Sequence, residues 1–388
     1  MRITKIIEKP VQLKSNISNA LVNFSEHTVS LLAVVTDKVV DGKPLVGLSF
    51  NSIGRYAQSG IINARMAPRV LAAPADSLLQ DGEDCLSPEK VLACAIKNEK
   101  PGGHGDRAAA ASAIELAVWD LNAKLRSEPA SHTIARHYGL VPQAKVRVYA
   151  AGGYYYDGDG AGKLEEELVG YGRKGFNKFK IKVGGAPLRT DLNRIETAIK
   201  TAGSGSNIAV DANGRFNLTD ALEYAKALQD YGLMWFEEIG DPLDYELNSL
   251  VAQAYSGAIA TGENLFSRQD VKNLLLFGGM RPNLDIFQMD SGLSYGITEY
   301  AKMLHEMESR GFGRAQACPH GGQLMALHVV AGLRLGGCEV YPSIFQPMGG
   351  FGDQTVVVDG QVSVPQDPGF GFEAKSNLIY SFAQMLAR

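Results

Sequence analysis

Seven polar or ionisable residues recur at near-constant intervals through the second half of this 388-residue chain, and each follows a short strand-like run. The gaps between them are 29, 26, 26, 27, 30 and 19 residues, and the residues are Lys182, Asp211, Glu237, Glu263, Asp290, His320 and Glu339. One βα unit of a parallel barrel takes about 30 residues, and (β/α)₈ enzymes keep their chemistry at the C-terminal ends of the strands. The spacing therefore predicts that the seven side chains converge at the mouth of a barrel.

Three of these residues are acids on consecutive predicted strands, namely Asp211, Glu237 and Glu263. Three carboxylates in one pocket repel one another unless a cation lies among them. Oxygen ligands suit a hard cation, Mg²⁺ first and Mn²⁺ second, so the pattern favours a metal site over solvated loop acids. Glu238 competes with Glu237, but adjacent residues of a strand point to opposite sides, and the spacing favours Glu237.

Lysines occupy alternate positions of the strand-like run KFKIK, with Lys178, Lys180 and Lys182 on one face. If that face is the barrel interior, Lys180 and Lys182 reach the mouth. Crowded ammonium groups lower one another's pKa, which would let one lysine act as a base near neutral pH. A strand edge with solvated lysines is the alternative reading of this segment taken alone.

His320 lies two strands beyond the last predicted metal ligand, and Asp290 ends the strand between them. His320 should therefore approach the pocket from the side opposite Lys182. A carboxylate on one imidazole nitrogen fixes the tautomer and favours imidazolium. The strand order predicts that His320 acts as an acid or a second base, whereas a lone histidine is usually structural.

The pattern of elements changes once along the chain. Residues 1–142 read as an α+β domain, with an antiparallel sheet whose hairpin turns at Asp41-Gly42, followed by helices. Residues 143–345 alternate strand and helix, which predicts the barrel. Residues 346–388 begin Gly-rich and then give a hairpin and a terminal helix, which we expect to return to the first domain.

The composition is that of an ordinary globular protein, with 45% hydrophobic and 21% charged residues. A net charge of -4 gives no reason to expect nucleic acid or an anionic membrane as a partner. No apolar run approaches the roughly 20 residues of a membrane helix, and the N-terminus lacks a signal-peptide core. Four cysteines without CxxC spacing are typical of reduced thiols, so we expect a cytoplasmic protein.

Several short motifs resemble the enolase superfamily, specifically its mandelate racemase-like group: KIK, VDANG, FEE, TGEN, PHGG and, earlier in the chain, ELAVWDLNAK. The resemblance implies an α/β fold, a modified (β/α)₈ TIM-like barrel under an α+β capping domain built from the N-terminal part and the C-terminal tail. It also implies a homo-oligomer, either a dimer or an octamer.

The same resemblance implies roles for the recurring residues. Mg²⁺ would be bound by Asp211, Glu237 and Glu263. Lys182 would be the base that removes an α-proton, with Lys180 tuning it. His320 with Asp290 would be the second acid or base.

Within this group the chain is most similar to the D-tartrate dehydratases, through NEKPGGHG, YAAGGYYY, GGAP, DANGRFN, GDPLDY, LSYG and FQPMGGFGD. This implies a small hydroxy diacid or sugar acid as substrate, best D-tartrate, which would lose water to give oxaloacetate. Expected substrate-binding residues are Lys100 for the second carboxylate, together with Glu339, Asn213, Asn19 and Arg55. The alternatives are another sugar-acid dehydratase, a racemase or epimerase of a 2-hydroxy acid using Lys182 and His320, and a non-catalytic carboxylate-binding protein.

Overall fold

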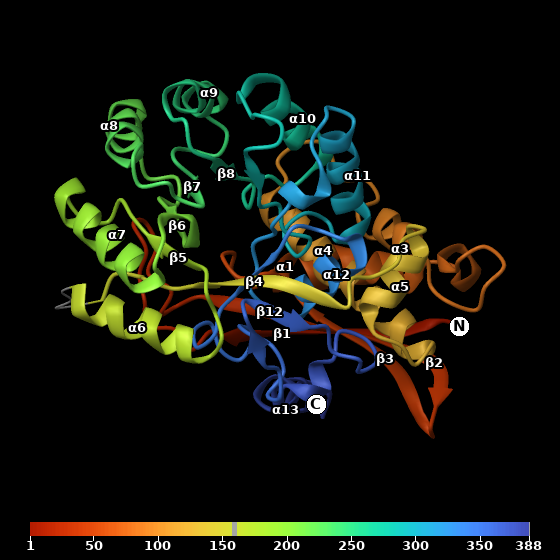
Figure 1. The fold of residues 1–388 in the computed structure, drawn as a ribbon. Coiled ribbons are helices and arrows are strands. Elements are labelled where there is room, and N and C mark those ends of the chain that lie inside the picture. The colour runs from red at the N-terminus through yellow and green to blue at the C-terminus, as the bar shows by residue number, and fades with distance from the viewer. Residues whose placement is uncertain (157–160, 388) are drawn as a thin grey trace.

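The N-terminal part of the computed structural model, which describes residues 1–156 and 161–387, begins with a three-stranded antiparallel sheet (Figure 1). Its strands are β1 (Ile3–Gln12), β2 (Thr28–Val40) and β3 (Lys43–Phe50). Asp41 and Gly42 turn between β2 and β3 with φ of 50° and 76°. Both values are left-handed, as a two-residue hairpin of this kind requires, so the predicted hairpin is confirmed.

Helices cover this sheet and complete the cap. They are α1 (Ser59–Ile61), the π-helical η1 (Ile62–Met66), α2 (Ala67–Ala72), the 3-10 turn η2 (Ala75–Leu78), α3 (Pro88–Ala95), α4 (Gly105–Leu125) and α5 (Ala130–His137). The alanine-rich α4 is buried along most of its length and packs on β2 and β3. A Cβ at Gly47 of β3 would lie 2.0 Å from the carbonyl oxygen of Ala117, so the close approach of helix and strand requires glycine there.

The second part of the chain forms a barrel of parallel strands. The strands are β4 (Lys145–Ala151), β5 (Phe179–Lys182), β6 (Ile208–Asp211), β7 (Trp235–Glu237), β8 (Ile259–Thr261), β9 (Ile286–Phe287) and β10 (Cys338–Val340). Each pairs with the next from β4 to β9, and β10 returns to pair with β4. Ala317, in the run before His320, makes a parallel bridge to Phe287 and takes the eighth strand position.

The strand positions are joined by helices on the outside of the barrel (Figure 1). These are α6 (Ala161–Arg173), α7 (Leu188–Ala202), α8 (Leu218–Leu228), α9 (Tyr245–Ala254), α10 (Arg268–Phe277), α11 (Ile297–Glu308) and α12 (Leu324–Leu333), with 3-10 turns η3 (Gly205–Asn207) and η4 (Arg314–Gln316). Asn217 caps α8 by accepting a hydrogen bond from the amide of Asp220. In the described residues, eight strand positions are thus joined by seven helices, which confirms the modified (β/α)₈ barrel.

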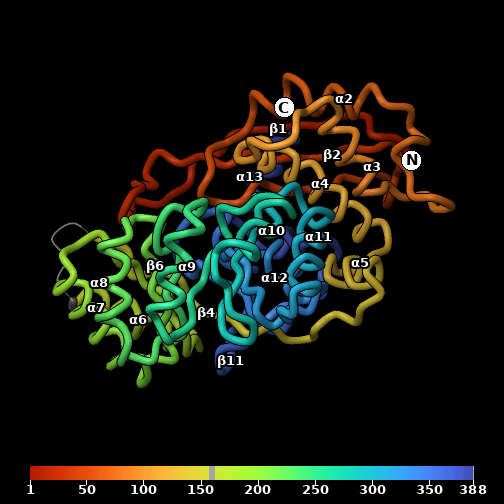
Figure 2. Tube along the Cα trace, turned by 90° about the horizontal axis from the view of Figure 1, so that it is seen from above, coloured from red at the N-terminus to blue at the C-terminus, as the bar shows by residue number. Residues whose placement is uncertain are grey.

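The C-terminal tail contacts both parts. The hairpin of β11 (Val357–Val358) and β12 (Gln361–Ser363) joins the barrel, since β12 pairs antiparallel with β4. After the 3-10 turn η5 (Phe372–Ala374), helix α13 (Ser376–Leu386) packs on β1 of the cap, where Figure 2 places the C-terminus. The tail therefore ties the cap to the barrel.

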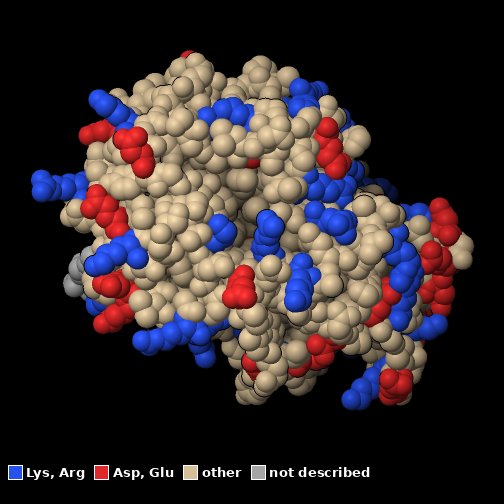
Figure 3. Space-filling model, viewed as in Figure 1, with Lys and Arg blue, Asp and Glu red and all other residues tan. Residues whose placement is uncertain are grey.

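The charged side chains on the face seen in Figure 3 are of both signs and interspersed. That face is hollowed near its middle. In the described part of the chain, no helix is both long enough and apolar enough to cross a membrane.

Candidate active site

Strand register brings the predicted lysines and acids together. Lys182 on β5 pairs with Asp211 on β6, which pairs with Glu237 on β7. The Lys182 ammonium lies 2.5 Å from Asp211 Oδ2. Lys180 Nζ lies 2.6 Å from Glu237 Oε1 and 2.7 Å from Glu339 Oε1. All five residues are buried, so these lysines face the barrel interior and are not on a solvated edge.

The expectation that crowding lowers the lysine pKa values is not what the structure shows. Burial does lower the pKa of Lys182, but the carboxylate of Asp211 outweighs it and the net direction is upward. Burial likewise lowers the pKa of Lys180, and Glu237 and Glu339 raise it well above its usual range. The cause is that each ammonium has carboxylates as its nearest charged neighbours, so attraction exceeds the repulsion between the two lysines.

Glu237 and Glu238 both belong to this buried group. Glu237 accepts hydrogen bonds from Lys180 and from the indole of Trp235, and burial together with the charge of Asp211 raises its pKa to about 7. Glu238 accepts from the side chain of Asn264, and burial and the nearby Glu263 raise its pKa well above the usual range.

The expectation that Glu238 points away from the pocket is wrong. Its φ of 42° is left-handed, and it follows the last residue of β7. The backbone at this point has left the extended conformation, so the strand alternation that separates neighbouring side chains no longer applies.

The group carries more carboxyl groups than cations. It has three cationic groups, Lys180, Lys182 and His320, and six acids, Asp211, Glu237, Glu238, Glu263, Asp290 and Glu339. If all nine are ionised, the net charge is three minus six, or -3. The buried Oδ1 of Asn213 also has no hydrogen-bond partner, while its backbone amide donates to Asp211.

This surplus of oxygen donors fits a hard divalent cation. Among the described residues, however, no three His, Cys, Asp or Glu side chains are already arranged to hold a metal ion. Asp211 and Glu237 point at lysines instead. Metal binding would therefore require each of these two carboxylates to leave its lysine partner and bind the cation.

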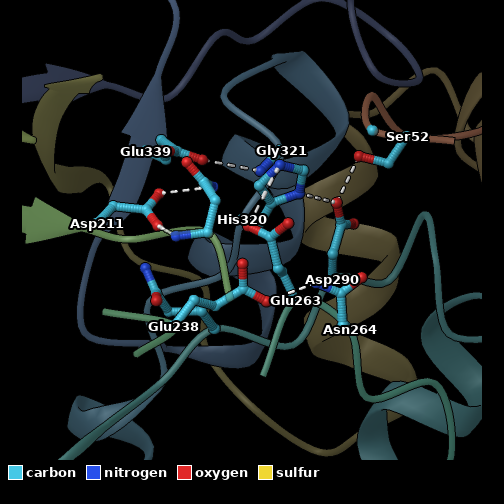
Figure 4. Close-up of polar contacts among 12 residues, drawn as sticks. Ser52, Asp211, Glu238, Glu263, Asn264, Asp290, His320, Gly321 and Glu339 are labelled. Atoms are coloured by element: carbon cyan, nitrogen blue, oxygen red, sulfur yellow. Dashed lines mark hydrogen bonds and ion pairs between the residues drawn. The ribbon is translucent and has the colours of Figure 1, made fainter. Parts of the chain in front are cut away.

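His320 has a hydrogen-bond partner at each ring nitrogen, and Figure 4 shows the one at Asp290. Nδ1 lies 2.9 Å from Asp290 Oδ2, which confirms the geometry expected from strand order. Nε2 lies 3.0 Å from the hydroxyl of Tyr341 and 3.9 Å from Glu263 Oε2. The Tyr341 hydroxyl donates its hydrogen to Glu339, so its oxygen is free to accept from Nε2–H. Both nitrogens then act as donors, which is the arrangement of an imidazolium.

The electrostatics of His320 agree with this geometry. Burial lowers its pKa, but Glu263 and the hydrogen bond to Asp290 raise the pKa to about 9. The group is therefore poised to donate a proton at neutral pH.

Three neighbours of the site were not found from the sequence. The Ser52 hydroxyl, from the cap, donates to Asp290 Oδ2. The ring of Tyr154 lies 5.1 Å from the Lys182 ammonium. Tyr341 follows Glu339 by two residues, so strand alternation could have identified it. Ser52 is 238 residues from Asp290, and no local pattern indicates that contact.

The predicted specificity residues divide into two sets. Arg55 reaches from the cap to Asn264, which in turn contacts Glu238, and Asn213 lies beside Asp211. Asn19 uses its side-chain oxygen in a local turn, accepting from the amides of residues 21 and 22. Lys100 is exposed and lines a separate cavity of about 240 Å³ with His104 and Tyr295. The structure therefore does not bring Asn19 or Lys100 to the buried group.

Comparison with known proteins identifies relatives along most of the chain. The curated relatives include an arabinonate dehydratase from Saccharolobus solfataricus, 26% identical over 72% of this chain and 74% of that protein. An L-talarate/galactarate dehydratase from Salmonella typhimurium is 26% identical over 77% of this chain and 71% of its own length. A 3,6-anhydro-alpha-L-galactonate cycloisomerase from Streptomyces coelicolor is 24% identical over 94% and 93%.

Solved structures share the fold. A racemase from Streptomyces coelicolor with bound magnesium has a TM-score of 0.76 at 22% identity, covering 96% of this chain and 98% of that one. An L-talarate dehydratase from Polaromonas, complexed with Mg and L-glucarate, has a TM-score of 0.75 at 22% identity, covering 95% and 94%. Residues 163–378 match the family described as enolase C-terminal domain-like. The chain therefore belongs to that family and, with it, to the enolase/mandelate racemase superfamily.

Proposed function

We propose that this protein is a Mg²⁺-dependent dehydratase of a 2,3-dihydroxy acid, with D-tartrate as the best candidate and oxaloacetate and water as products. The observation that carries the proposal is the pairing of a buried lysine, Lys182, with a buried His320–Asp290 pair around one carboxylate-rich barrel mouth. Dehydratases of sugar acids among the relatives support the reaction class. The tartrate-like motifs of the sequence support the small diacid.

The metal is proposed to bind Asp211, Glu237 and Glu263, with Mn²⁺ as a possible substitute for Mg²⁺. The surplus of buried carboxyl groups supports this site, as do the neighbours solved with magnesium. When bound, the cation would stabilise the negative charge that develops on the substrate carboxylate as the α-proton leaves. Glu238 lies beside the proposed ligands and is the nearest competitor for one coordination position.

Lys182 is proposed to remove the α-proton. In the metal-free structure its pKa is raised because Asp211 is its partner. Once Asp211 turns to the cation, burial and the neighbouring ammonium of Lys180 both favour neutral Lys182, the form a base needs. Lys180 keeps Glu339 as its partner when Glu237 turns to the cation, so it remains charged and supplies a hydrogen-bond donor to the enediolate.

His320 is proposed to donate its Nε2 proton to the departing β-hydroxyl. The proton from C2 resides on Lys182, the C3–O bond breaks, and the hydroxyl leaves as water with the proton from His320. The enol product tautomerises to the 2-keto acid. Asp290 and Ser52 hold the ring in place during this step.

Substrate selection is assigned to the cap. Arg55 donates to the side chain of Asn264 in the barrel, which in turn donates to Glu238. Lys100 would pair the second carboxylate only after the segment around Gly102, Gly103 and Gly105, all with positive φ, changes conformation. Asn19 would have to leave its local turn to reach substrate.

The direct test is keto-acid formation from D-, L- and meso-tartrate and common sugar acids, with Mg²⁺ and with EDTA. We expect product from D-tartrate only when the metal is present, and none from Lys182→Ala or His320→Asn. Lys178→Ala is a matched control, because Lys178 belongs to the same lysine run but donates to the carbonyl of Ser206, outside the buried group. Deuterium incorporation at the α-carbon without keto acid from any compound would instead identify a racemase or epimerase.

A further inference from the structure

The hydroxyl of Tyr341 connects the His320–Asp290 pair to the Lys180–Glu339 pair. It lies 3.0 Å from His320 Nε2 and 3.0 Å from Glu339 Oε2. Glu339 is paired with Lys180, and His320 with Asp290. A phenol has one hydrogen to donate, and here the carboxylate of Glu339 takes it. The phenolic oxygen is therefore the acceptor that faces Nε2, the nitrogen that would deliver the proton.

Tight packing fixes the ring that carries this hydroxyl. A Cβ at Gly322 would lie 2.4 Å from the Tyr341 ring, and one at Gly349 would lie 3.1 Å from the Tyr341 Cβ. The ring of Phe345 meets the Tyr341 ring edge-on at 4.8 Å between centroids. Tyr341 is 2% exposed, so its hydroxyl is paired with these two partners and not with bulk solvent. Gly322 and Gly349 thus leave the space for a fixed phenol beside the imidazole.

We propose that Tyr341 is a positioning residue for the dehydration step: its oxygen accepts the Nε2–H of His320 and keeps the ring oriented until the departing hydroxyl takes its place as acceptor, while its own hydrogen is donated to Glu339. This inference rests on the proposed function, because it assigns His320 the role of acid. Among the described contacts the hydroxyl does not touch Lys182, so its loss should slow removal of the α-proton less than departure of the β-hydroxyl. Removing the Tyr341 hydroxyl should therefore slow keto-acid formation more than exchange of the α-proton.

The test compares Tyr341→Phe with wild type for keto-acid formation and for α-deuterium exchange into recovered substrate. We expect kcat for keto-acid formation to fall at least ~10-fold, about the effect of one lost hydrogen bond, with KM within about threefold and exchange retained. Tyr224→Phe is the matched control, since its hydroxyl also donates to a buried carboxylate, that of Asp191, away from the site. The kcat of Tyr224→Phe for keto-acid formation should lie within about twofold of the wild-type value.

Two results would overturn the inference. One is dehydration by Tyr341→Phe within twofold of wild type. The other is an equal fall of exchange and dehydration, which would indicate a general packing defect.

A second readout keeps the inference testable if wild type forms no keto acid from any compound, which would refute the proposed function. Carbethoxylation of His320 by diethyl pyrocarbonate, followed by peptide mass spectrometry, reports access to Nε2 without any substrate. We expect His320 to react at least ~3-fold faster in Tyr341→Phe than in wild type or Tyr224→Phe, because Nε2 loses its partner. Equal rates in all three proteins would show that Tyr341 does not hold the imidazole.

Discussion

Lys182 Nζ lies 2.5 Å from Asp211 Oδ2, so the proposed base and a proposed metal ligand are each other's partners in the metal-free protein. This relationship couples metal binding to base activation. A cation that takes Asp211 removes the main cause of the raised lysine pKa.

Metal binding should stabilise the fold. A ligand that binds only the folded state adds about 2.7 kcal/mol to the free energy of unfolding at 100 times its Kd. We expect Mg²⁺ to raise the melting temperature of wild type by several degrees, and Asp211→Asn and Glu263→Gln to abolish the increase. Asp230→Asn, an exposed acid, is the control and should keep it. A Mg²⁺-induced increase that survives in Asp211→Asn would place the metal elsewhere.

The stability of the metal-free protein should depend on pH through His320. Its pKa is about 9 in the folded protein, above the ordinary 6.5, so folding favours the protonated form. The resulting stabilisation, ~3 kcal/mol, is fully present below pH 6.5 and is lost as pH rises through 9. Urea unfolding in EDTA between pH 6 and 10 should therefore show the difference between wild type and His320→Asn shrinking toward alkaline pH. A difference that stays constant over this range would refute the assigned pKa.

The contact between cap and barrel at Gly296 should be sensitive to a single methyl group. Glu115 on α4 accepts hydrogen bonds from the amides of Ile297 and Thr298 at the start of α11. A Cβ at Gly296 would lie 2.0 Å from a Glu115 carboxylate oxygen, and the φ of Gly296 is 83°. Gly296→Ala should lower the free energy of unfolding by about 3 kcal/mol or more.

Gly170→Ala is the matched substitution for that experiment. Gly170 lies within α6, where a Cβ would meet nothing within 4 Å. It should raise stability by about 0.5–1 kcal/mol, because alanine loses less conformational freedom than glycine in a helix. Urea unfolding of both variants distinguishes the crowded site from the open one, and equal effects would mean that the Glu115 contact does not restrict Gly296.

Lys100 should affect dicarboxylates selectively. Its ammonium is exposed in this structure, so a role in binding depends on movement of the glycine-containing segment that follows it. We expect Lys100→Ala to lower kcat/KM for a dicarboxylate at least ~10-fold and to leave a monocarboxylate sugar acid within about twofold. A similar decrease of kcat/KM for both substrate classes would show that Lys100 does not bind the second carboxylate.

The barrel and the convergence of the recurring lysines, acids and histidine could be predicted because their pattern is local and repeated. Lys180 and Lys182 alternate on one strand, and Asp211 and Glu237 follow at one βα unit each, so register alone brings them together. The pairing of His320 with Asp290 likewise follows from strand order.

The details beyond that pattern depend on backbone irregularity and on distant segments. Glu238 joins the buried group because its backbone is left-handed, which strand alternation does not anticipate. Ser52 reaches Asp290 from the cap, across 238 residues. The lysine pKa values follow from which carboxylate each ammonium meets, a property of the assembled site.

The measurement that tests the central assignment most directly is the reaction of D-tartrate with Mg²⁺ in ²H₂O, followed by NMR for wild type, Lys182→Ala and His320→Asn. We expect wild type to form the keto acid and His320→Asn to form none while still exchanging the α-proton for deuterium. Lys182→Ala should do neither. Keto-acid formation by His320→Asn at the wild-type rate, or α-exchange by Lys182→Ala, would contradict the assignment of Lys182 as base and His320 as acid.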